Sequence, residues 1–109
     1  MKFLTCLLLS AIIVVACTTQ KPSLPKCLEA KIKEYSTSSS CSDAKVDEYT
    51  FQGKTVYAFG PGTCGADMTT EVMTADCTTL GRLGGIAGNT KINGEEFSNA
   101  KFVKTVWKK

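Results

Sequence analysis

Histidine is absent from all 109 residues of the chain. Its absence removes the side chain that most often acts as a general base near neutral pH, and also the commonest protein ligand of metals. Catalysis by a Ser-His-Asp or a Cys-His arrangement is therefore excluded. We predict that the chain is not an enzyme and that it carries no cofactor and no metal.

Three further motifs are missing. The lysines are scattered apart from Lys108 and Lys109, and the net charge is only +3, so the concentrated basic face of a nucleic-acid binder is lacking. No cysteines have the close spacing of thiolate zinc sites or of a C-x-x-C redox pair. The glycine-rich stretch 81–89 lacks the Gly-Lys-Ser/Thr ending of a phosphate loop, so it predicts a turn-rich connection, with a ligand loop as the alternative.

No apolar run is long enough to cross a bilayer, which takes roughly 20 residues. Phe3–Ala16 is short, follows Lys2 and ends in a small residue, which is typical of a secretory signal over residues 1–16. The junction Val14-Val15-Ala16-Cys17 resembles the bacterial lipobox. That resemblance implies that Cys17 becomes the first mature residue and carries diacylglycerol on its sulfur, so the membrane is an expected partner.

The residues after Cys17 bear on location. Thr18 rather than aspartate follows the cysteine, which by the usual sorting pattern favours the outer membrane. The absence of an acidic run after it favours the periplasmic face. Residues 17–24 are mostly polar and contain Pro22, so they predict a short tether. Ordinary secretion, with Cys17 unmodified, is the alternative.

The remaining residues, 25–109, are enough for one small domain. A domain of this size buries a modest core, so crosslinks are a natural supplement. Four cysteines remain in it, and an even number in an oxidising compartment predicts two disulfides. These cysteines are Cys27, Cys41, Cys64 and Cys77.

Three pairings of these cysteines are possible. We favour Cys64–Cys77, because a hairpin brings its ends together, with Cys27–Cys41. The second bridge requires the chain after a helix to return almost straight. Each bridge would close a loop of about 15 residues and stabilise the fold by roughly 3 kcal/mol.

One helix is expected at the start of the domain. Leu28, Ile32 and Tyr35 recur at helical spacing and predict a helix over 25–36 whose apolar stripe packs on a sheet. Ser23 is expected to cap it, with Pro25 in its first turn. The hydroxyl-rich residues 37–40 are expected to end it.

Short strands follow. The runs 46–51 and 54–59 flank Gln52-Gly53, a two-residue turn, and predict a β-hairpin. Further strands are expected within 64–77 and over 78–83, joined at an Ala75-Asp76 turn.

A terminal strand is expected over 100–107. Alternation places Phe102, Lys104 and Val106 on one side of it, and Val103, Thr105 and Trp107 on the other. The predicted fold class is α+β, with one N-terminal helix packed on a small antiparallel sheet of four to five strands and crosslinked by disulfides.

Acidic and aromatic side chains are the candidates for a binding site. Asp67 and Glu71 offer oxygens to calcium or a small ligand near the loop 84–89, although solvated side chains are the commoner case. Aromatic residues would form a patch if the helix leaves part of the sheet uncovered, although core packing is their commoner role. The aromatic candidates are Tyr57 and Trp107, together with Tyr49 and Phe59.

Residues 49–57 read Tyr-Thr-Phe-Gln-Gly-Lys-Thr-Val-Tyr. They resemble the Tyr-x-x-x-Gly-Lys-x-Val-Tyr signature of small lipoproteins of Bacteroidota type. Further elements of that family match Cys27-Leu28, Cys64-Gly65-Ala66-Asp67, Cys77 and Gly84-Gly85. The resemblance therefore spans residues 26–107. This chain has Thr63-Cys64 where the family has two adjacent cysteines. The family has no assigned activity, so the resemblance implies location and fold and supplies no mechanism.

The sequence as a whole predicts a lipid-anchored protein of the cell envelope. Its domain is expected to be a non-catalytic binding or structural module with a protein or glycan partner. A small-ligand or calcium-binding module is the alternative.

Overall fold

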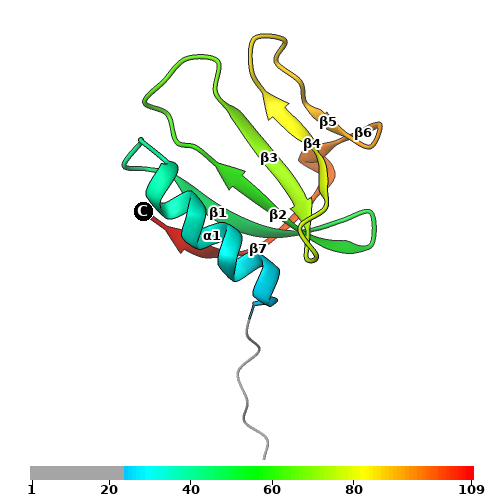
Figure 1. Cartoon of the computed structure of the whole chain (residues 1–109). Helices are drawn as coiled ribbons and strands as arrows, with labels where there is room; N and C mark the ends of the chain where they lie inside the picture. The colour runs from blue at the N-terminus through cyan, green and yellow to red at the C-terminus, as the bar shows by residue number, and fades with distance from the viewer. Residues whose placement is uncertain (1–23) are drawn as a thin grey trace, which may run out of the picture.

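One α-helix, one 3-10 helix and seven strands make up residues 24–109, which the computed structural model describes. Five strands form an antiparallel sheet in the order β4-β3-β2-β1-β7, and β5 pairs with β6 (Figure 1). The α+β class, with a helix on an antiparallel sheet, is confirmed. The elements are α1 (Lys26–Ser38), β1 (Lys45–Phe51), β2 (Lys54–Gly60), β3 (Thr69–Thr74), β4 (Thr79–Gly84), β5 (Lys91–Ile92), β6 (Glu95–Glu96), η2 (Phe97–Asn99) and β7 (Lys101–Lys108).

The predictions for the start of the chain lie outside the described residues. They concern the signal peptide 1–16, the lipid on Cys17, the tether 17–24 except for its last residue, and the cap at Ser23. Pro25 precedes α1 as its cap, instead of lying in its first turn, and has an extended ψ of 147°. No helix within residues 24–109 has the length and apolar character needed to cross a bilayer.

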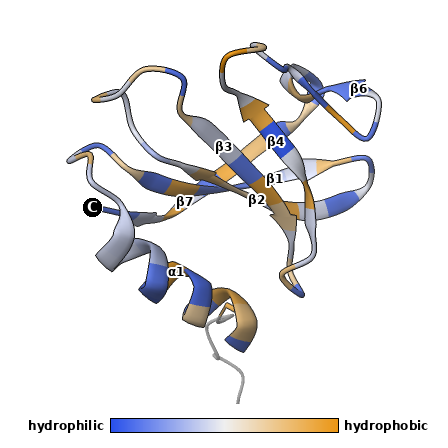
Figure 2. Ribbon diagram, turned by 45° about the horizontal axis from the view of Figure 1, so that its top comes forward, coloured by the Kyte–Doolittle hydropathy of each residue, from blue (hydrophilic) through white to orange (hydrophobic). Residues whose placement is uncertain are grey.

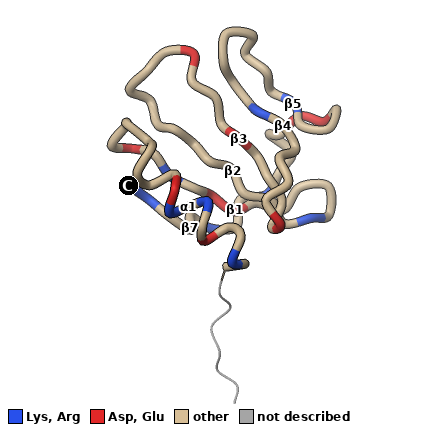
Figure 3. Tube along the Cα trace, viewed as in Figure 1, with Lys and Arg blue, Asp and Glu red and all other residues tan. Residues whose placement is uncertain are grey.

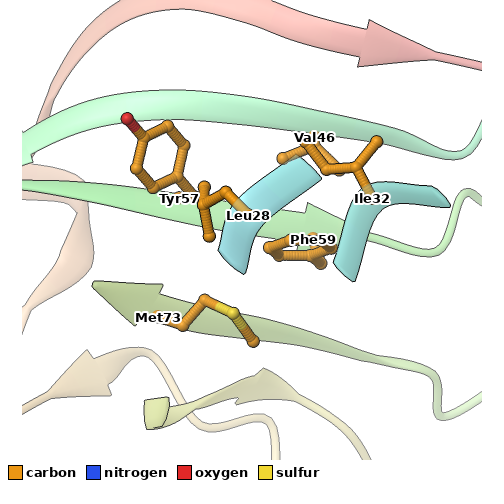
Figure 4. Close-up of a cluster of buried hydrophobic side chains, with 6 residues drawn as sticks. All are labelled: Leu28, Ile32, Val46, Tyr57, Phe59 and Met73. Carbon is orange, nitrogen blue, oxygen red and sulfur yellow. The ribbon is translucent and has the colours of Figure 1, made fainter. Parts of the chain in front are cut away.

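The predicted apolar stripe of α1 faces the sheet. Leu28 and Ile32 are buried and point at strands β1 and β2 (Figure 4). The helix ends at Ser38, later than expected. That prediction was wrong because the hydroxyls of Ser36 and Thr37 donate to carbonyls three residues back, at 2.7 and 2.9 Å. They satisfy acceptors that a helix end otherwise leaves open.

The predicted hairpin is confirmed as β1 and β2. Tyr49 pairs with Val56, and Phe51 pairs with Lys54. Gln52 and Gly53 form the turn, with φ of 52° and 74°. Two successive positive φ angles are what a tight turn between twisted strands requires.

Both faces of the sheet are covered. Figure 2 shows α1 on one side of the sheet and β6 on the other. Residues 92–100 pack on the face of the sheet opposite α1. Four successive side chains of β2 are therefore buried, because they point alternately to the two covered faces. The helix-side cluster consists of Leu28, Ile32, Val46, Tyr57, Phe59 and Met73 (Figure 4). The second cluster consists of Phe51, Val56, Ala58, Val72 and Ile92.

The glycine-rich stretch 81–89 continues β4 into a tight connection. A Cβ atom on Gly81 would lie 3.0 Å from Cδ1 of Ile92, so the glycine leaves room for that buried side chain. The Asn89 amide donates to the carbonyls of Arg82 and Lys91, at 2.6 and 2.9 Å. The predicted turn-rich connection is confirmed.

Strand β7 does not alternate as expected. Its pairing with β1 shifts register twice, so that Val46 and Asp47 pair with Trp107 and Thr105, which skips Val106. The second shift skips Val103. Each bulge reverses the alternation once, so the side on which the residues between the two bulges lie cannot be read from the sequence of the strand alone. Lys104 and Phe102 consequently belong to opposite faces of the sheet.

The presence of two disulfides is confirmed, but the favoured pairing was wrong. Cys27 is bonded to Cys77, with 6.1 Å between their Cα atoms, and Cys41 is bonded to Cys64, with 5.5 Å. The first joins the start of α1 to the turn after β3. The second joins the chain just after α1 to the loop before β3. Each disulfide therefore fixes one end of the helix to the sheet.

Element lengths explain why the favoured pairing fails. From Cys27 to Ser38, α1 rises about 16 Å, and the three steps from Ser38 to Cys41 span at most about 11 Å. A bridge to Cys27, which needs Cα atoms within about 7 Å, would require these steps to run fully extended straight back along the helix, and Cys41 is bonded to Cys64 instead. Cys64 and Cys77 lie beyond opposite ends of β3, which spans six residues and about 20 Å.

The two crosslinks differ in loop length, with sequence separations of 50 and 23. The chain-entropy model gives about 4 kcal/mol for Cys27–Cys77 and about 3.5 kcal/mol for Cys41–Cys64. We expect urea unfolding to show that a Cys27→Ser/Cys77→Ser variant has a free energy of unfolding lower than the wild type by about 4 kcal/mol. The matched Cys41→Ser/Cys64→Ser variant should show a smaller decrease, of about 3.5 kcal/mol. Non-reducing peptide mapping that linked Cys27 to Cys41 would contradict this arrangement.

Candidate functional site

A hollow of about 550 Å³ lies on the helix-bearing face of the sheet. Tyr57 is only 5% exposed there, and Glu48 pairs across strands with Lys104 in the same lining. Burial raises the pKa of Tyr57, and the negative charge of Glu48 raises it further. The phenol is therefore neutral at physiological pH. The lining is Leu24, Glu48, Thr55, Tyr57, Ala75, Lys104, Thr105 and Val106.

A second hollow, of about 420 Å³, lies on the opposite face of the sheet. We call it the aromatic hollow, because Tyr49 meets Phe97 and Phe102 edge-on, with ring centroids 5.0 and 5.8 Å apart. Burial, and then the charge of Asp47, raises the pKa of Tyr49. Its rim is polar, since the Thr90 hydroxyl donates to Glu96 at 3.1 Å. Its lining is Tyr49, Leu83, Asn89, Thr90, Glu96, Phe97, Ser98 and Ala100.

The aromatic residues singled out from the sequence separate into different surroundings. Tyr57 and Phe59 belong to the helix-side core. Trp107 is half-buried beside Tyr35, with ring centroids 6.0 Å apart, in a groove between α1 and β7. Tyr49 faces the other way. Sequence reasoning missed Phe97 entirely, because only the tertiary fold brings it from η2 onto β1.

The carboxylates Asp67 and Glu71 do not meet in one hollow. Glu71 lies on β3, where it pairs with Arg82 at 3.6 Å and accepts a hydrogen bond from the Thr79 hydroxyl. Asp67 lies in the exposed loop before β3, with a φ of 58°. Within residues 24–109, no three acidic or cysteine side chains gather into a group that could hold a metal ion.

Two carboxylates do share a smaller hollow, of about 180 Å³, between α1 and β3. They are Glu71 and Glu34, and Glu34 is 3.8 Å from the ammonium of Lys31. Each lies beside a cation, Glu34 beside Lys31 and Glu71 beside Arg82. Burial, and then the charge of Glu71, raises the pKa of Tyr35 in the same hollow.

Two further acidic residues hold the structure together. Asp47 is 5% exposed, accepts a hydrogen bond of 2.6 Å from Thr105 and lies 3.3 Å from the ammonium of Lys45. Asp43 accepts from the amide and hydroxyl of Thr63. Buried or looped carboxylates with several donors act as structural acceptors. They tie β1 to β7 and the loop after α1 to the loop before β3.

The ionisable groups predict stability that is greatest between about pH 4.5 and pH 10. Hydrogen bonds lower the pKa of three carboxyls, which therefore stabilise the fold above their ordinary values and lose that contribution as the pH falls. Burial raises the pKa of three tyrosines, whose contribution is full below pH 10.0 and is lost as the pH rises. The groups are Asp43, Asp76 and Glu95, and Tyr35, Tyr49 and Tyr57.

Urea unfolding across this range, with tyrosine ionisation followed by ultraviolet absorbance, checks the prediction. An Asp43→Asn variant should lose part of the acid dependence and keep the alkaline limb. Native tyrosines that titrate at or below their ordinary pKa of 10.0 would contradict it.

Comparison with known proteins gives one match. Residues 31–109 match the family described as Domain of unknown function (DUF6970). No curated protein and no solved structure matches the chain. The expectation of a family without an assigned activity is thereby confirmed, while the lipid anchor and the Bacteroidota origin stay predictions. Because the match covers well over half of the sequence, the chain belongs to the family that shares this domain of unknown function.

Proposed function

We propose that this protein is exported, anchored in the envelope through a lipid on Cys17, and acts there as a non-catalytic binding module. The two disulfides are the observation that carries export. Cysteines pair stably in oxidising compartments and stay reduced in a mesophile's cytoplasm. The apolar run over 3–16 and the lipobox-like junction before Cys17 supply the route.

Acylation at Cys17 would hold the domain at the membrane surface. Each buried methylene contributes about 0.8 kcal/mol, so one chain alone binds weakly while two or three hold persistently. Thr18 after the cysteine favours the outer membrane, and the lack of an acidic run favours its periplasmic face.

The aromatic hollow is the binding surface that we favour. Tyr49 and Phe97 offer apolar ring faces beside the polar groups of Thr90, Glu96 and Ser98. Convergent polar groups around an apolar floor are what ligand sites share. A sugar ring has apolar C–H faces and a hydroxyl rim, so this chemistry fits a glycan, and a protein side chain of similar character fits as well.

A small-ligand module is the second candidate, and the hollow lined by Tyr57 favours it. Its Glu48 and Lys104 would contact a polar ligand. The separate surroundings of Asp67 and Glu71 do not favour the calcium version. Catalysis is disfavoured by the absence of histidine and by the paired carboxylates at Glu34 and Glu71.

Export and anchoring predict a defined modification at Cys17. Labelled palmitate should enter the wild-type protein and should be lost in a Cys17→Ser variant, which should also keep residues 1–16. The matched control is Cys6→Ser, which removes a cysteine from the apolar run and should leave labelling unchanged. Equal labelling of both variants would rule out the proposed anchor.

The two hollows can be separated by blocking each at an exposed residue. Ser98→Tyr should fill the aromatic hollow, and Thr55→Tyr should fill the helix-side hollow. If a glycan is the ligand, β-linked oligosaccharides should raise the melting temperature of the wild type and of Thr55→Tyr but not of Ser98→Tyr. The reverse pattern would move the site to the helix side. A shift with calcium chloride alone would revive the metal version.

A further inference from the structure

β7 is the outermost strand of the sheet, and within residues 24–109 it pairs with β1 alone (Figure 1). Its outer edge therefore faces away from the protein. Phe102 is 58% exposed and Val103 is 47% exposed, although both belong to a strand. The three lysines of the strand, Lys101, Lys104 and Lys108, are exposed as well.

Most of the positive charge of this edge has no acidic neighbour. Residues 101–109 contain no acidic residue. Among the ion pairs within 4 Å in the described residues, none involves a β7 lysine. Lys101 pairs across strands with Thr50, and Lys108 with Lys45, so only Lys104 lies opposite an acid. Figure 3 shows the lysines of β7 in blue leading to the C-terminus.

The described part of the chain also begins beside this strand. Leu24, the first described residue, lines one hollow with Lys104 and Thr105 and another with Trp107. Seven residue steps separate it from Cys17, which reach at most about 25 Å when fully extended. A lipid on Cys17 would therefore keep the β7 edge close to the bilayer.

We propose that the β7 edge docks on an anionic phospholipid surface. Lys101, Lys104 and Lys108 contact the headgroup phosphates, while Phe102 and Val103 enter the boundary between headgroups and acyl chains. This inference rests on the proposed anchor for the nearness of the surface, but the contact itself needs only β7. A basic patch beside a lipid chain is a known combination for surface binding.

A bilayer fits this edge better than another strand does. The bulges at Val103 and Val106 interrupt the row of outward amides and carbonyls that an added strand would need. A second copy pairing antiparallel about the middle of β7 would place Lys101 opposite Lys108, and facing like charges are destabilising. A headgroup surface requires neither a continuous ladder nor a register.

Docking would give the anchored domain a fixed orientation. With β7 against the membrane, the opposite edge of the sheet, β4, and the exposed Ile86 beyond it face away from the bilayer.

Trp107 is the only tryptophan and lies in β7, so it reports on docking. Purified, processed protein is combined with vesicles of phosphatidylcholine, alone or mixed with phosphatidylglycerol, that contain brominated lipid. We expect quenching of Trp107 to be clearly stronger with phosphatidylglycerol than without it, and this difference to be lost at high salt as the Debye length falls to about 3 Å. Equal quenching in both vesicles would overturn the proposal.

Matched variants separate the edge from general charge and apolarity. Lys101→Glu/Lys108→Glu should weaken vesicle binding at least about tenfold. Lys54→Glu/Lys91→Glu changes the net charge equally outside β7 and should have a much smaller effect. Phe102→Ser should likewise weaken vesicle binding more than Ile86→Ser does, although Ile86 is the more exposed side chain, at 89%. Equal effects of test and control variants would refute an edge-specific surface.

The outcomes also separate this inference from the proposed anchor. If Cys17 carries no lipid and the protein still binds phosphatidylglycerol vesicles through β7, the anchor fails and the docking surface stands. If the lipidated protein is held by its anchor but shows no dependence on phosphatidylglycerol, the docking surface fails alone. Binding of an acidic extended peptide without any vesicle binding would assign the edge to a protein partner and overturn the proposal.

Discussion

The two disulfides fix both ends of α1 to the sheet, and the rest of the domain depends on this constraint. Cys27–Cys77 fixes the start of the helix, and Cys41–Cys64 holds the chain that follows its end. The helix buries few large side chains, chiefly Leu28 and Ile32. A single amphipathic helix on a small sheet is marginal without further restraint. Crosslinks at both ends make that limited apolar contact sufficient.

A sheet covered on both faces supports two different kinds of surface. α1 covers only part of its own face and leaves the hollow lined by Tyr57. The segment 92–100 covers the second face and leaves the aromatic hollow around Tyr49 and Phe97. Because the strands beneath are buried on both sides, the floors of these hollows are held in place by packing. The geometry suits recognition, which needs preformed surfaces.

The edge strand β7 is protected against pairing with other strands and yet exposes an apolar side chain. Its lysines and its bulges at Val103 and Val106 are devices that keep sheet edges from pairing with other chains. The same residues leave Phe102 uncovered beside unpaired positive charge. A strand that resists other strands while presenting apolar and basic groups is suited to a surface without backbone register, such as a bilayer.

Residues that are close together in the chain were enough to predict the helix and the hairpin, and the cysteine count was enough to predict the number of disulfides. The spacing of Leu28 and Ile32 and the Gln52-Gly53 turn act over a few residues, so the helix and the hairpin could be predicted from their own segments. The four cysteines predicted two disulfides because an even number of thiols pairs in an oxidising compartment. The folded chain was needed to find which cysteines meet, where β7 bulges, and that Phe97 contacts Tyr49. These depend on helix length, strand order and contacts between distant segments, which local periodicity does not encode.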